Sequence, residues 1–180
     1  MTAPAFSVRT TLPGDLAAVE AIYAHHVLTG LGSFEEVPPG ATEIATRWRD
    51  VTEAGLPHLV AVADGAVLGF AYAGPYRLRS AYRFCLEDSV YVAADAIGRG
   101  VGGALLDAVL VASEAWGCRQ MIAAIGDSEN AGSIGLHRAA GFRHIGTLEA
   151  VGFKFGAWRD VVIMQRTLGP GGDTLPEEDA

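Results

Sequence analysis

Basic residues are scarce in this sequence, and their scarcity limits what the protein can bind. The 180 residues carry 13 Lys and Arg against 21 Asp and Glu, a formal net charge of −8, and Lys154 is the only lysine. Affinity for the phosphate backbone of nucleic acids depends on dense cationic surfaces. We therefore expect no nucleic-acid partner, whereas a local basic pocket for a small anion is compatible with the composition.

Cysteines are also few. Cys85 and Cys118 lie in apolar surroundings without metal-type spacing, and two thiols in a chain of this length do not make a disulfide framework. Four of the five histidines show no partner spacing typical of metal ligands, so we expect no metal. This pattern favours a protein of the reducing cytoplasm.

Long uninterrupted apolar runs are missing too. The most apolar window, residues 58–74, is about as long as a membrane span but is broken by Asp64-Gly65. Residues 1–9 show no basic start followed by an apolar stretch, so they do not resemble a secretory signal. We therefore expect a cytoplasmic protein without a membrane partner.

Half of the residues are hydrophobic, enough for the core of one domain, and their spacing alternates between helical and strand-like periods. Asp64-Gly65 between two apolar runs is a strong signal for a two-residue hairpin turn. A hairpin followed by strand, helix, strand, helix and strand indicates an α/β fold with a mixed sheet. The predicted strands span residues 7–10, 59–63, 66–73, 84–92, 121–125, 142–148 and 161–168, and the predicted helices span 16–30 (capped by Asp15), 42–54, 104–116 and 131–140.

The composition changes after residue 168. Residues 169–180 contain three Gly, two Pro and four carboxylates, with no aromatic side chain. Such a segment cannot bury enough apolar surface to order itself. We expect one domain over residues 1–168 and a disordered acidic, Gly/Pro-rich tail over 169–180.

The most informative local motif is rich in glycine. The run Gly98-Arg99-Gly100-Val101-Gly102-Gly103 follows a predicted strand and opens a predicted helix. The unpaired N–H groups of such a helix start face any bound anion, and Arg99 can add a charge-assisted contact, so a pyrophosphate fits the loop. The alternative is a loop whose glycines serve only the turn. No Gly-Lys-Ser/Thr follows, which excludes a P-loop, and the position in mid-chain after a hairpin disfavours a nicotinamide site.

Three further stretches, together with this loop, carry a resemblance to a known family. They are residues 70–75 (FAYAGP), 87–92 (EDSVYV) and 152–160 (GFKFGAWRD). Over residues 6–168 the chain resembles the GNAT acetyltransferases, and in particular the phosphinothricin and methionine sulfoximine N-acetyltransferases. The resemblance implies the GNAT fold, a central mixed twisted sheet flanked by helices. It also implies direct transfer of acetyl from acetyl-CoA to the primary amine of a small amino-acid-like substrate.

For the reaction itself the resemblance implies Glu87 as the general base, because the motif of this branch places its catalytic acid there. A carboxylate half buried among the apolar residues of its strand has a raised pKa, which suits proton abstraction near neutral pH. The alternative is an ordinary strand glutamate, and the neighbouring Asp88 is expected to be solvated or structural. His137 stands where many members carry a Tyr that protonates the leaving thiolate; the alternative is a structural histidine.

The resemblance also implies which residues bind acetyl-CoA. Asn130 and His137, seven residues apart, share one helix face. The loop of the superfamily usually begins with Gln or Arg, and Ile97 stands there in this chain. This departure keeps open an acyl-CoA-binding sensor without chemistry. The expected acetyl-CoA contacts are Val90, Tyr91, Val92, Gly98, Arg99, Gly100, Val101, Gly102, Gly103 and Asn130.

The amine substrate is expected to meet an arginine- and tyrosine-rich segment. Arginine forks bind carboxylates bidentately, so an amino-acid-like substrate is favoured, although a solvated basic loop is the alternative. A protein N-terminus or a polyamine remains open as the acceptor. The aromatic segment 152–158 implies a homodimer by resemblance. The expected substrate residues are Phe34, Glu35, Tyr72, Arg77, Arg79, Tyr82 and Lys154.

Overall fold

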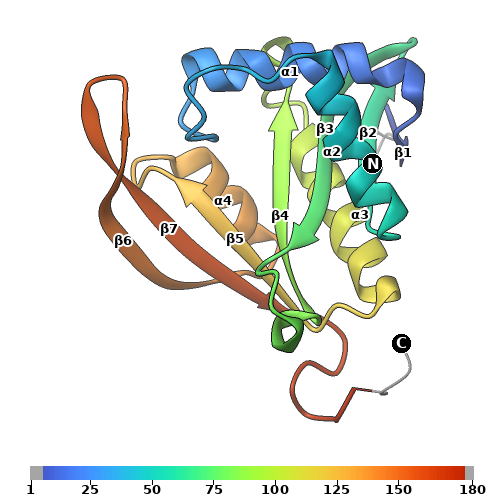
Figure 1. Ribbon diagram of the computed structural model, residues 1–180, viewed down its shortest axis with the longest axis vertical. Coiled ribbons are helices and arrows are strands. Elements are labelled where there is room, and N and C mark those ends of the chain that lie inside the picture. Colours follow the sequence, from blue (N-terminus) through green and yellow to red (C-terminus); the bar gives the residue numbers. More distant parts are fainter. Residues whose placement is uncertain (1–5, 177–180) are drawn as a thin grey trace.

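A seven-stranded mixed sheet with the strand order β1-β2-β3-β4-β5-β7-β6 runs through the computed structural model, which describes residues 6–176 (Figure 1). Among the strands of residues 6–176, only β4 and β5 pair in parallel. This confirms the predicted α/β class. The strands are β1 (Ser7–Thr10), β2 (His58–Ala63), β3 (Ala66–Pro75), β4 (Cys85–Val92), β5 (Gln120–Gly126), β6 (Arg143–Lys154) and β7 (Ala157–Thr167), and the α-helices are α1 (Leu16–Thr29), α2 (Ala41–Glu53), α3 (Val101–Trp116) and α4 (Ala131–Ala139).

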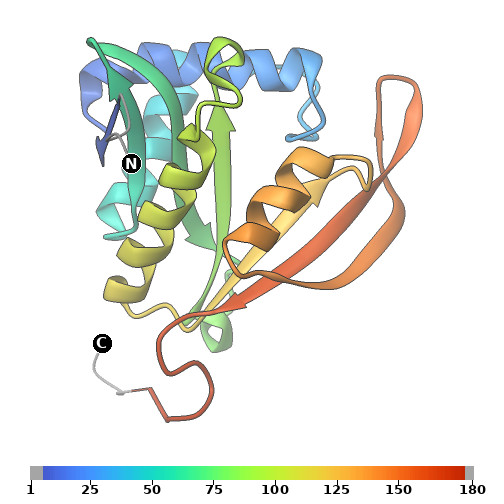
Figure 2. The ribbon, with the colours of Figure 1, turned by 180° about the vertical axis from the view of Figure 1, so that it is seen from behind.

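The helices cover the sheet on both faces. Helices α1 and α2 pack on one face of β2, β3 and β4, whereas α3 and α4 lie on the opposite face, as the view from behind shows (Figure 2). The first face buries Val19, Val60, Phe70 and Tyr91, and the second buries a larger core around Leu105. Successive side chains of a strand point to opposite faces. Glu87 and Asp88, which are adjacent on β4, therefore lie on opposite faces of the sheet.

The sheet opens between its two central strands. Strands β4 and β5 share only three residue pairs, from Cys85↔Gln120 to Glu87↔Ile122, and then diverge (Figure 1). Phe84 O accepts the Arg119 N–H on the β5 side, whereas Ala93 N–H donates to Leu68 O on the β3 side. Backbone groups alternate in direction along a strand, so the even-numbered residues of β4 turn their N–H and C=O groups toward the opening.

Most local predictions agree with the structure. Asp64 and Gly65 both have positive φ, 49° and 81°, as the hairpin turn between β2 and β3 requires. Helix α3 begins at Val101 rather than Ala104, directly after the glycine loop. Asp15 precedes α1 as predicted, but its carboxylate binds Arg9 at 2.6 Å and the Leu12 N–H at 2.7 Å instead of capping the helix.

The largest difference concerns the last two strands. Strand β6 extends to Lys154, and β7 begins at Ala157. The aromatic segment 152–158 is therefore the end of one long hairpin. The hairpin forms the edge of the sheet beside β5, and its end projects beyond β5 (Figure 1). Both strands exceed their predicted lengths because bulges near Gly146 and between Leu148 and Gly152 interrupt the apolar alternation.

The start of the acidic tail folds into turns. Gly171 N–H donates to Leu168 O, and Arg119 donates to Gly171 O at 3.3 Å and to Thr174 Oγ1 at 3.1 Å. Residues 177–180 lie outside the described residues, so disorder of the tail as a whole stays a prediction. No α-helix within residues 6–176 has the length and apolarity of a membrane span.

Candidate active site

A cavity of about 820 Å³ lies where β4 and β5 separate. The α1–α2 loop, the start of α3 and the helix α4 complete its walls. None of the predicted substrate residues lies on this lining, and Arg99 is exposed outside it. The predicted residues on the lining are Glu87, Val90, Tyr91, Val92, Gly98, Gly100, Val101, Gly102, Gly103, Asn130 and His137.

The glycine loop forms one end of the cavity. Gly98 and Gly100 have φ of 79° and 81°, a left-handed conformation that favours glycine. The first hydrogen bond of this helix runs from Ala104 N–H to Gly100 O. The N–H groups of the preceding residues, 101–103, therefore have no partner inside the helix and present partial positive charge. This arrangement suits a pyrophosphate.

The opened edge of β4 forms a second wall. Val90 and Val92 turn their backbone groups toward the opening, because they are even-numbered residues of this strand. Val92 O accepts a hydrogen bond from His26 Nε2 at 2.9 Å, which fixes the end of the edge. Tyr91 turns its backbone toward β3, and its hydroxyl donates to Gly32 O at 3.4 Å. The structure thus brings Val90 and Val92 to the site through the backbone, and Tyr91 through its ring.

Glu87 lies where the pairing with β5 ends. The side chain is half-buried, and burial raises the pKa of its carboxyl group, with a further rise from the charge of Asp88. The charge of Arg77 opposes this shift. Tyr72 stands on the same sheet face, opposite Ser89, and burial raises the pKa of its phenol. Glu87 is therefore a base of raised proton affinity near a half-buried phenol.

Asp88 occupies the other face and is buried. Its Oδ2 lies 2.9 Å from His137 Nε2, and His137 Nδ1 donates to Ser133 O at 2.8 Å. Burial opposes the charged imidazolium, but the hydrogen bond to Asp88 and its charge outweigh burial, and the pKa of His137 is raised. Of the two expectations for Asp88, solvated or structural, burial excludes the first, since β4 alternation turns the side chain inward toward α4.

Asn130 stands at the start of α4. Its Oδ1 accepts the Ser133 N–H at 3.1 Å, which caps the helix, and its Nδ2 donates to Gly126 O at 3.3 Å. The amide thus ties the end of β5 to the helix that carries His137. Contact with acetyl-CoA stays a prediction for this residue.

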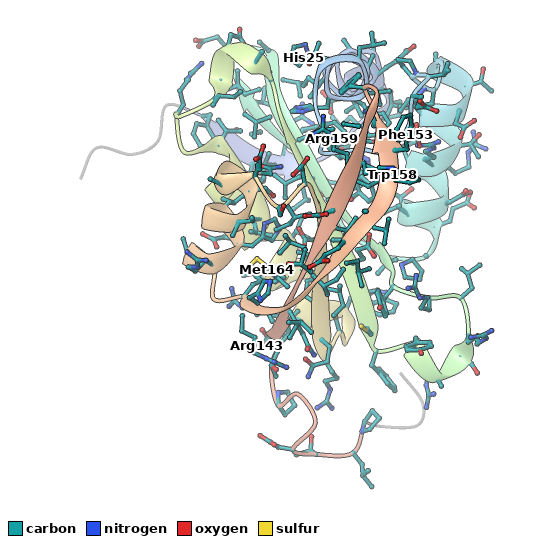
Figure 3. All side chains as sticks on the ribbon, turned by 90° about the vertical axis from the view of Figure 1, so that its left-hand side faces the viewer. His25, Arg143, Phe153, Trp158, Arg159 and Met164 are labelled. Carbon is teal, nitrogen blue, oxygen red and sulfur yellow. The ribbon has the colours of Figure 1, made fainter. Side chains whose placement is uncertain are left out.

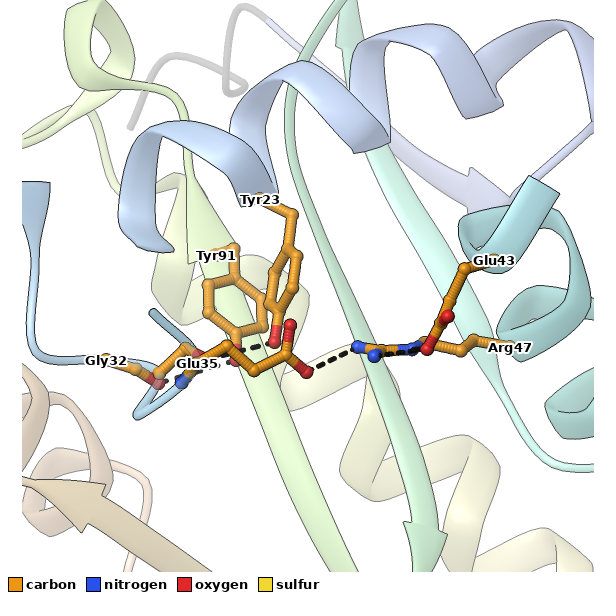
Figure 4. A network of polar contacts seen from close by, with 7 residues as sticks. Tyr23, Gly32, Glu35, Glu43, Arg47 and Tyr91 are labelled. Carbon is orange, nitrogen blue, oxygen red and sulfur yellow. Dashed lines mark hydrogen bonds and ion pairs between the residues drawn. The ribbon is translucent and has the colours of Figure 1, made fainter. Parts of the chain in front are cut away.

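The α1–α2 loop is held by a polar network (Figure 4). Arg47 of α2 pairs with Glu35 at 2.8 Å and with Glu43 at 2.6 Å. The Tyr23 hydroxyl lies 3.0 Å from Ser33 Oγ. Glu35, predicted to bind substrate, therefore has a cationic partner within the chain. Arg47 was missed because no local signal links an α2 arginine to a residue twelve positions earlier.

Lys154 of β6 connects the β6–β7 hairpin to the α1–α2 loop by hydrogen bonds. Its ammonium group donates to Ser33 O at 2.6 Å and to Gly30 O at 3.0 Å, and the side chain is 1% exposed. Burial lowers the pKa of this lysine. Lys154 therefore has a structural role in the described residues and lies outside the cavity lining, and its contact with substrate stays a prediction.

Phe34 packs between β5 and β6. A Cβ at Gly152 would overlap the Phe34 ring, and a Cβ at Gly126 would overlap Leu31 O. These two glycines therefore let the loop approach both strands closely. Phe34 borders the site as packing and lies outside the cavity lining.

The remaining predicted substrate residues lie on the exposed connection between β3 and β4. The Arg77 guanidinium stacks 4.6 Å from the Tyr76 ring, and Tyr82 meets the same ring edge-on. Arg77 is close enough to act on the pKa of Glu87. The structure brings neither Arg79 nor Tyr82 to the cavity lining.

Comparisons with known proteins agree with this geometry. A family model described as "Acetyltransferase (GNAT) family" matches residues 19–142. The chain is 58% identical over 173 residues to a phosphinothricin N-acetyltransferase of Alcaligenes faecalis, covering 96% of this chain and 88% of that protein. It is 41% identical over 168 residues to an L-methionine sulfoximine/L-methionine sulfone acetyltransferase of Pseudomonas aeruginosa, covering 91% and 95%.

A solved structure extends the likeness to three dimensions. The phosphinothricin acetyltransferase of Sinorhizobium meliloti, crystallised with AcCoA, superposes with a TM-score of 0.95 at 44% identity, covering 98% of this chain and 95% of that one. The sequence resemblance is thereby confirmed. With its mixed sheet, opened β4–β5 pair and glycine loop, the chain belongs to the GNAT acetyltransferase family, in the branch of the phosphinothricin and methionine sulfoximine N-acetyltransferases.

Proposed function

We propose that this acetyltransferase moves acetyl from acetyl-CoA to the primary amine of a small amino-acid-like substrate of the phosphinothricin or methionine sulfoximine/sulfone type. The names of its relatives support this substrate class. The observation that carries the proposal is the position of Glu87, a half-buried carboxylate of raised pKa at the point where β4 and β5 separate.

The residues of the cavity fit acetyl-CoA. The N–H groups of Val101, Gly102 and Gly103 suit the pyrophosphate, and the opened β4 edge at Val90 and Val92 suits an extended amide-containing arm. When bound, acetyl-CoA supplies a thioester carbonyl open to attack. The N–H groups of the β4 edge are fixed donors for the charge that develops on that carbonyl oxygen.

Glu87 acts on the amine. Its raised pKa lets the carboxylate take a proton from the substrate ammonium near neutral pH, directly or through a water. Arg77 offers a guanidinium within charge reach of Glu87, so the substrate carboxylate binds there while its amine faces Glu87. Tyr72 borders the amine from β3. Arg79, Tyr82 and Arg99 are further candidates for binding the anionic groups of the two substrates.

Release of the coenzyme A thiol across a panel of amines tests the proposal. The panel includes phosphinothricin, methionine sulfoximine, methionine sulfone, a polyamine and a peptide amine. We expect turnover on the first three. Turnover confined to the polyamine or the peptide moves the acceptor to another class, and thermal stabilisation by acetyl-CoA without turnover on any amine indicates a sensor.

Glu87→Gln tests the base. We expect kcat to fall by about a hundredfold or more, with the melting temperature preserved, because general-base contributions have this size. Glu53→Gln, an exposed glutamate at the end of α2, is the matched control. An unchanged kcat and pH profile in Glu87→Gln rejects the role of this residue.

Two further properties belong to the proposal. The homodimer implied by the resemblance places the aromatic hairpin end against a second copy, and its exposed apolar side chains support this. The reaction takes place in the cytoplasm, in line with two free cysteines and an acetyl-CoA requirement.

A further inference from the structure

The hydrogen-bond partners of Asp88 and His137 determine how many protons this pair holds. His137 Nδ1 lies 2.8 Å from Ser133 O, a carbonyl that only accepts, so Nδ1 carries a hydrogen. On the other side of the ring, Nε2 lies 2.9 Å from a carboxylate oxygen of Asp88. A hydrogen bond at this distance requires a further proton between the two atoms. The Asp88–His137 pair therefore holds two protons on or between its polar atoms. A neutral histidine next to an ionised carboxylate would hold one.

This pair is buried and belongs to the cavity wall. The side chains of His137 and Asp88 are 5% and 1% exposed, and both residues line the cavity where β4 and β5 separate. The second oxygen of Asp88, Oδ1, is buried without a partner among the described residues. A buried carboxylate with one unsatisfied oxygen is costly unless its charge serves a partner. Here that partner is His137.

We infer that Asp88 is a positioning residue for acetyl transfer: it orients His137 and keeps a proton on it at the cavity wall, from which the leaving thiolate is protonated. This inference rests on the proposed function. Asp88 acts through His137 and lies on the sheet face opposite Glu87, so the two carboxylates of β4 serve opposite ends of the reaction.

Ser133 offers the route from the ring to the cavity. Both ring nitrogens of His137 have partners, so the ring does not face a ligand with a free N–H. The Ser133 hydroxyl lies 3.4 Å from Nδ1 and lines the cavity. Hydroxyls both donate and accept, so Ser133 can pass a proton on.

Acetyl transfer by this proton route conserves atoms and charge. The substrate ammonium first gives one proton to Glu87, which passes it to solvent. The neutral amine nitrogen then bonds to the acetyl carbon and gives a second proton to Glu87, and the carbon–sulfur bond breaks with its electron pair on sulfur. The Ser133 hydroxyl gives its proton to the sulfur and takes one from Nδ1 of His137. The ring is then neutral beside Asp88. Glu87 releases its second proton to solvent, and a proton from solvent returns to Nδ1, which restores the hydrogen bond to Ser133 O.

Few other charges act on the ring. Glu87 is next to Asp88 on β4 but on the other face, Arg138 of α4 is exposed, and Phe142 packs edge-on against the ring without charge. At the end of β5, Asp127 is paired with Arg159 at 3.0 Å. Asp88 is therefore the carboxylate that sets the protonation of His137.

The pH dependence of kcat in Asp88→Asn tests the inference. The wild-type profile should rise as Glu87 loses its proton and fall as His137 loses its own. Without the carboxylate, His137 loses its proton at lower pH, so we expect the alkaline limb to move down by about one pH unit or more. At about pH 8.5 this lowers kcat by about tenfold, while KM for acetyl-CoA changes by less than about twofold. Asp88→Glu should restore part of the loss.

A second acyl donor separates proton supply from a structural effect. With an acetyl thioester of an aromatic thiol, whose thiolate leaves without protonation, the deficits of Asp88→Asn and Ser133→Ala should both shrink to less than about twofold. Asp50→Asn on α2 is the control and should match wild type with both donors. An alkaline limb at the wild-type pH, or equal losses with both thioesters, overturns the inference.

The outcomes also distinguish this inference from the proposed function. If wild type releases no coenzyme A thiol with any amine, the proposed function fails. If wild type turns over and Asp88→Asn does not change the profile, only the inference fails. Should Asp88→Asn not fold, Ser133→Ala with the two thioesters decides alone: equal losses overturn the inference, and a loss confined to acetyl-CoA supports it.

Discussion

At the scale of single residues, His58 shows how burial sets a charge. Its ring lies beside those of Phe70 and Tyr72, nearly parallel to both at 7°, and its Nδ1 is 2.8 Å from the Thr11 hydroxyl. Burial lowers the pKa of His58 to about 4. The histidine therefore stays neutral at physiological pH and supports the ring of Tyr72 as an aromatic neighbour.

This shift makes stability depend on pH in a known direction. An unfolded histidine has a pKa near 6.5, so between about pH 6.5 and 4 the unfolded chain binds a proton that the folded chain excludes. The contribution to the free energy of unfolding is complete above about pH 6.5 and is lost as the pH falls toward 4, by roughly 3 kcal/mol.

His58→Asn tests this dependence, because its amide keeps a partner for Thr11 but has no proton to gain. We expect urea unfolding of the variant to show a smaller decrease in unfolding free energy between about pH 7 and 5 than wild type. An equal decrease in both proteins means that other groups, such as His26, carry the acid sensitivity. The absolute stability of the variant also falls through the lost stacking, so the slope is the quantity to compare.

At the scale of elements, the hairpin of β6 and β7 sets the position of the α1–α2 loop. Lys154 binds two carbonyls of that loop, and Gly152 leaves room for the Phe34 ring. The same loop contributes Leu31 and Gly32 to the cavity wall. Packing at the hairpin therefore reaches the cavity wall and the loop that carries the predicted substrate residues Phe34 and Glu35.

Gly152→Ala should displace this loop. The added methyl group overlaps Phe34, so we expect a loss of about 1–3 kcal/mol in unfolding free energy. KM for the amine should rise more than KM for acetyl-CoA, because Phe34 and Glu35 of this loop are predicted substrate residues. Gly146→Ala on the same strand, where a Cβ meets open space, is the matched control. Equal kinetics in the two variants would show that the loop does not shape the amine site.

Turns and helix ends that depend on the conformation of one or two residues were predictable from the sequence. The Asp64-Gly65 turn, the glycine loop and the helix stop at Gly117 depend on backbone conformations that few other residues adopt. The ends of β6 and β7 were not predictable, because bulges and a positive φ at Ala150 break their periodicity. Propensity and period carry no information on such bulges.

The residues of the candidate site also fall into a group that was predictable from the sequence and a group that was not. Glu87 and the glycine loop follow from contiguous motifs. The Asp88–His137 pair joins residues 49 positions apart, and Lys154 meets carbonyls 121 and 124 positions away. Such contacts depend on how α4 and the hairpin dock on the sheet, which no local pattern specifies. In the sequence, these contacts are indicated only by a charged residue, Asp88 or Lys154, within a predominantly apolar strand segment.

At the scale of the whole molecule, one edge of the sheet carries an exposed apolar surface. Phe153 and Trp158 pack edge-on at 5.3 Å on the outer part of the hairpin, where Figure 3 shows them together. Val151 and Phe155 are exposed nearby. Large exposed apolar patches mark interaction sites, and the proposed second copy of the chain would cover this one.

Sedimentation of wild type and Trp158→Glu tests the homodimer. We expect a dimer at micromolar concentration that the variant converts to monomer, because a carboxylate in an apolar interface stays unpaired. Val111→Glu on α3 changes an equally exposed aliphatic residue away from the hairpin and should leave the dimer intact. A monomeric wild type contradicts the proposed assembly.

The three residue pairs between β4 and β5 also make the molecule two half-sheets joined at one end. A ligand that takes up the free backbone groups of β4 across the opening becomes a structural bridge between the halves. Its binding then slows amide hydrogen exchange on both sides of the opening, far beyond the atoms it touches. We therefore expect the bound ligand, in place of further strand pairing, to complete the sheet beyond the third residue pair.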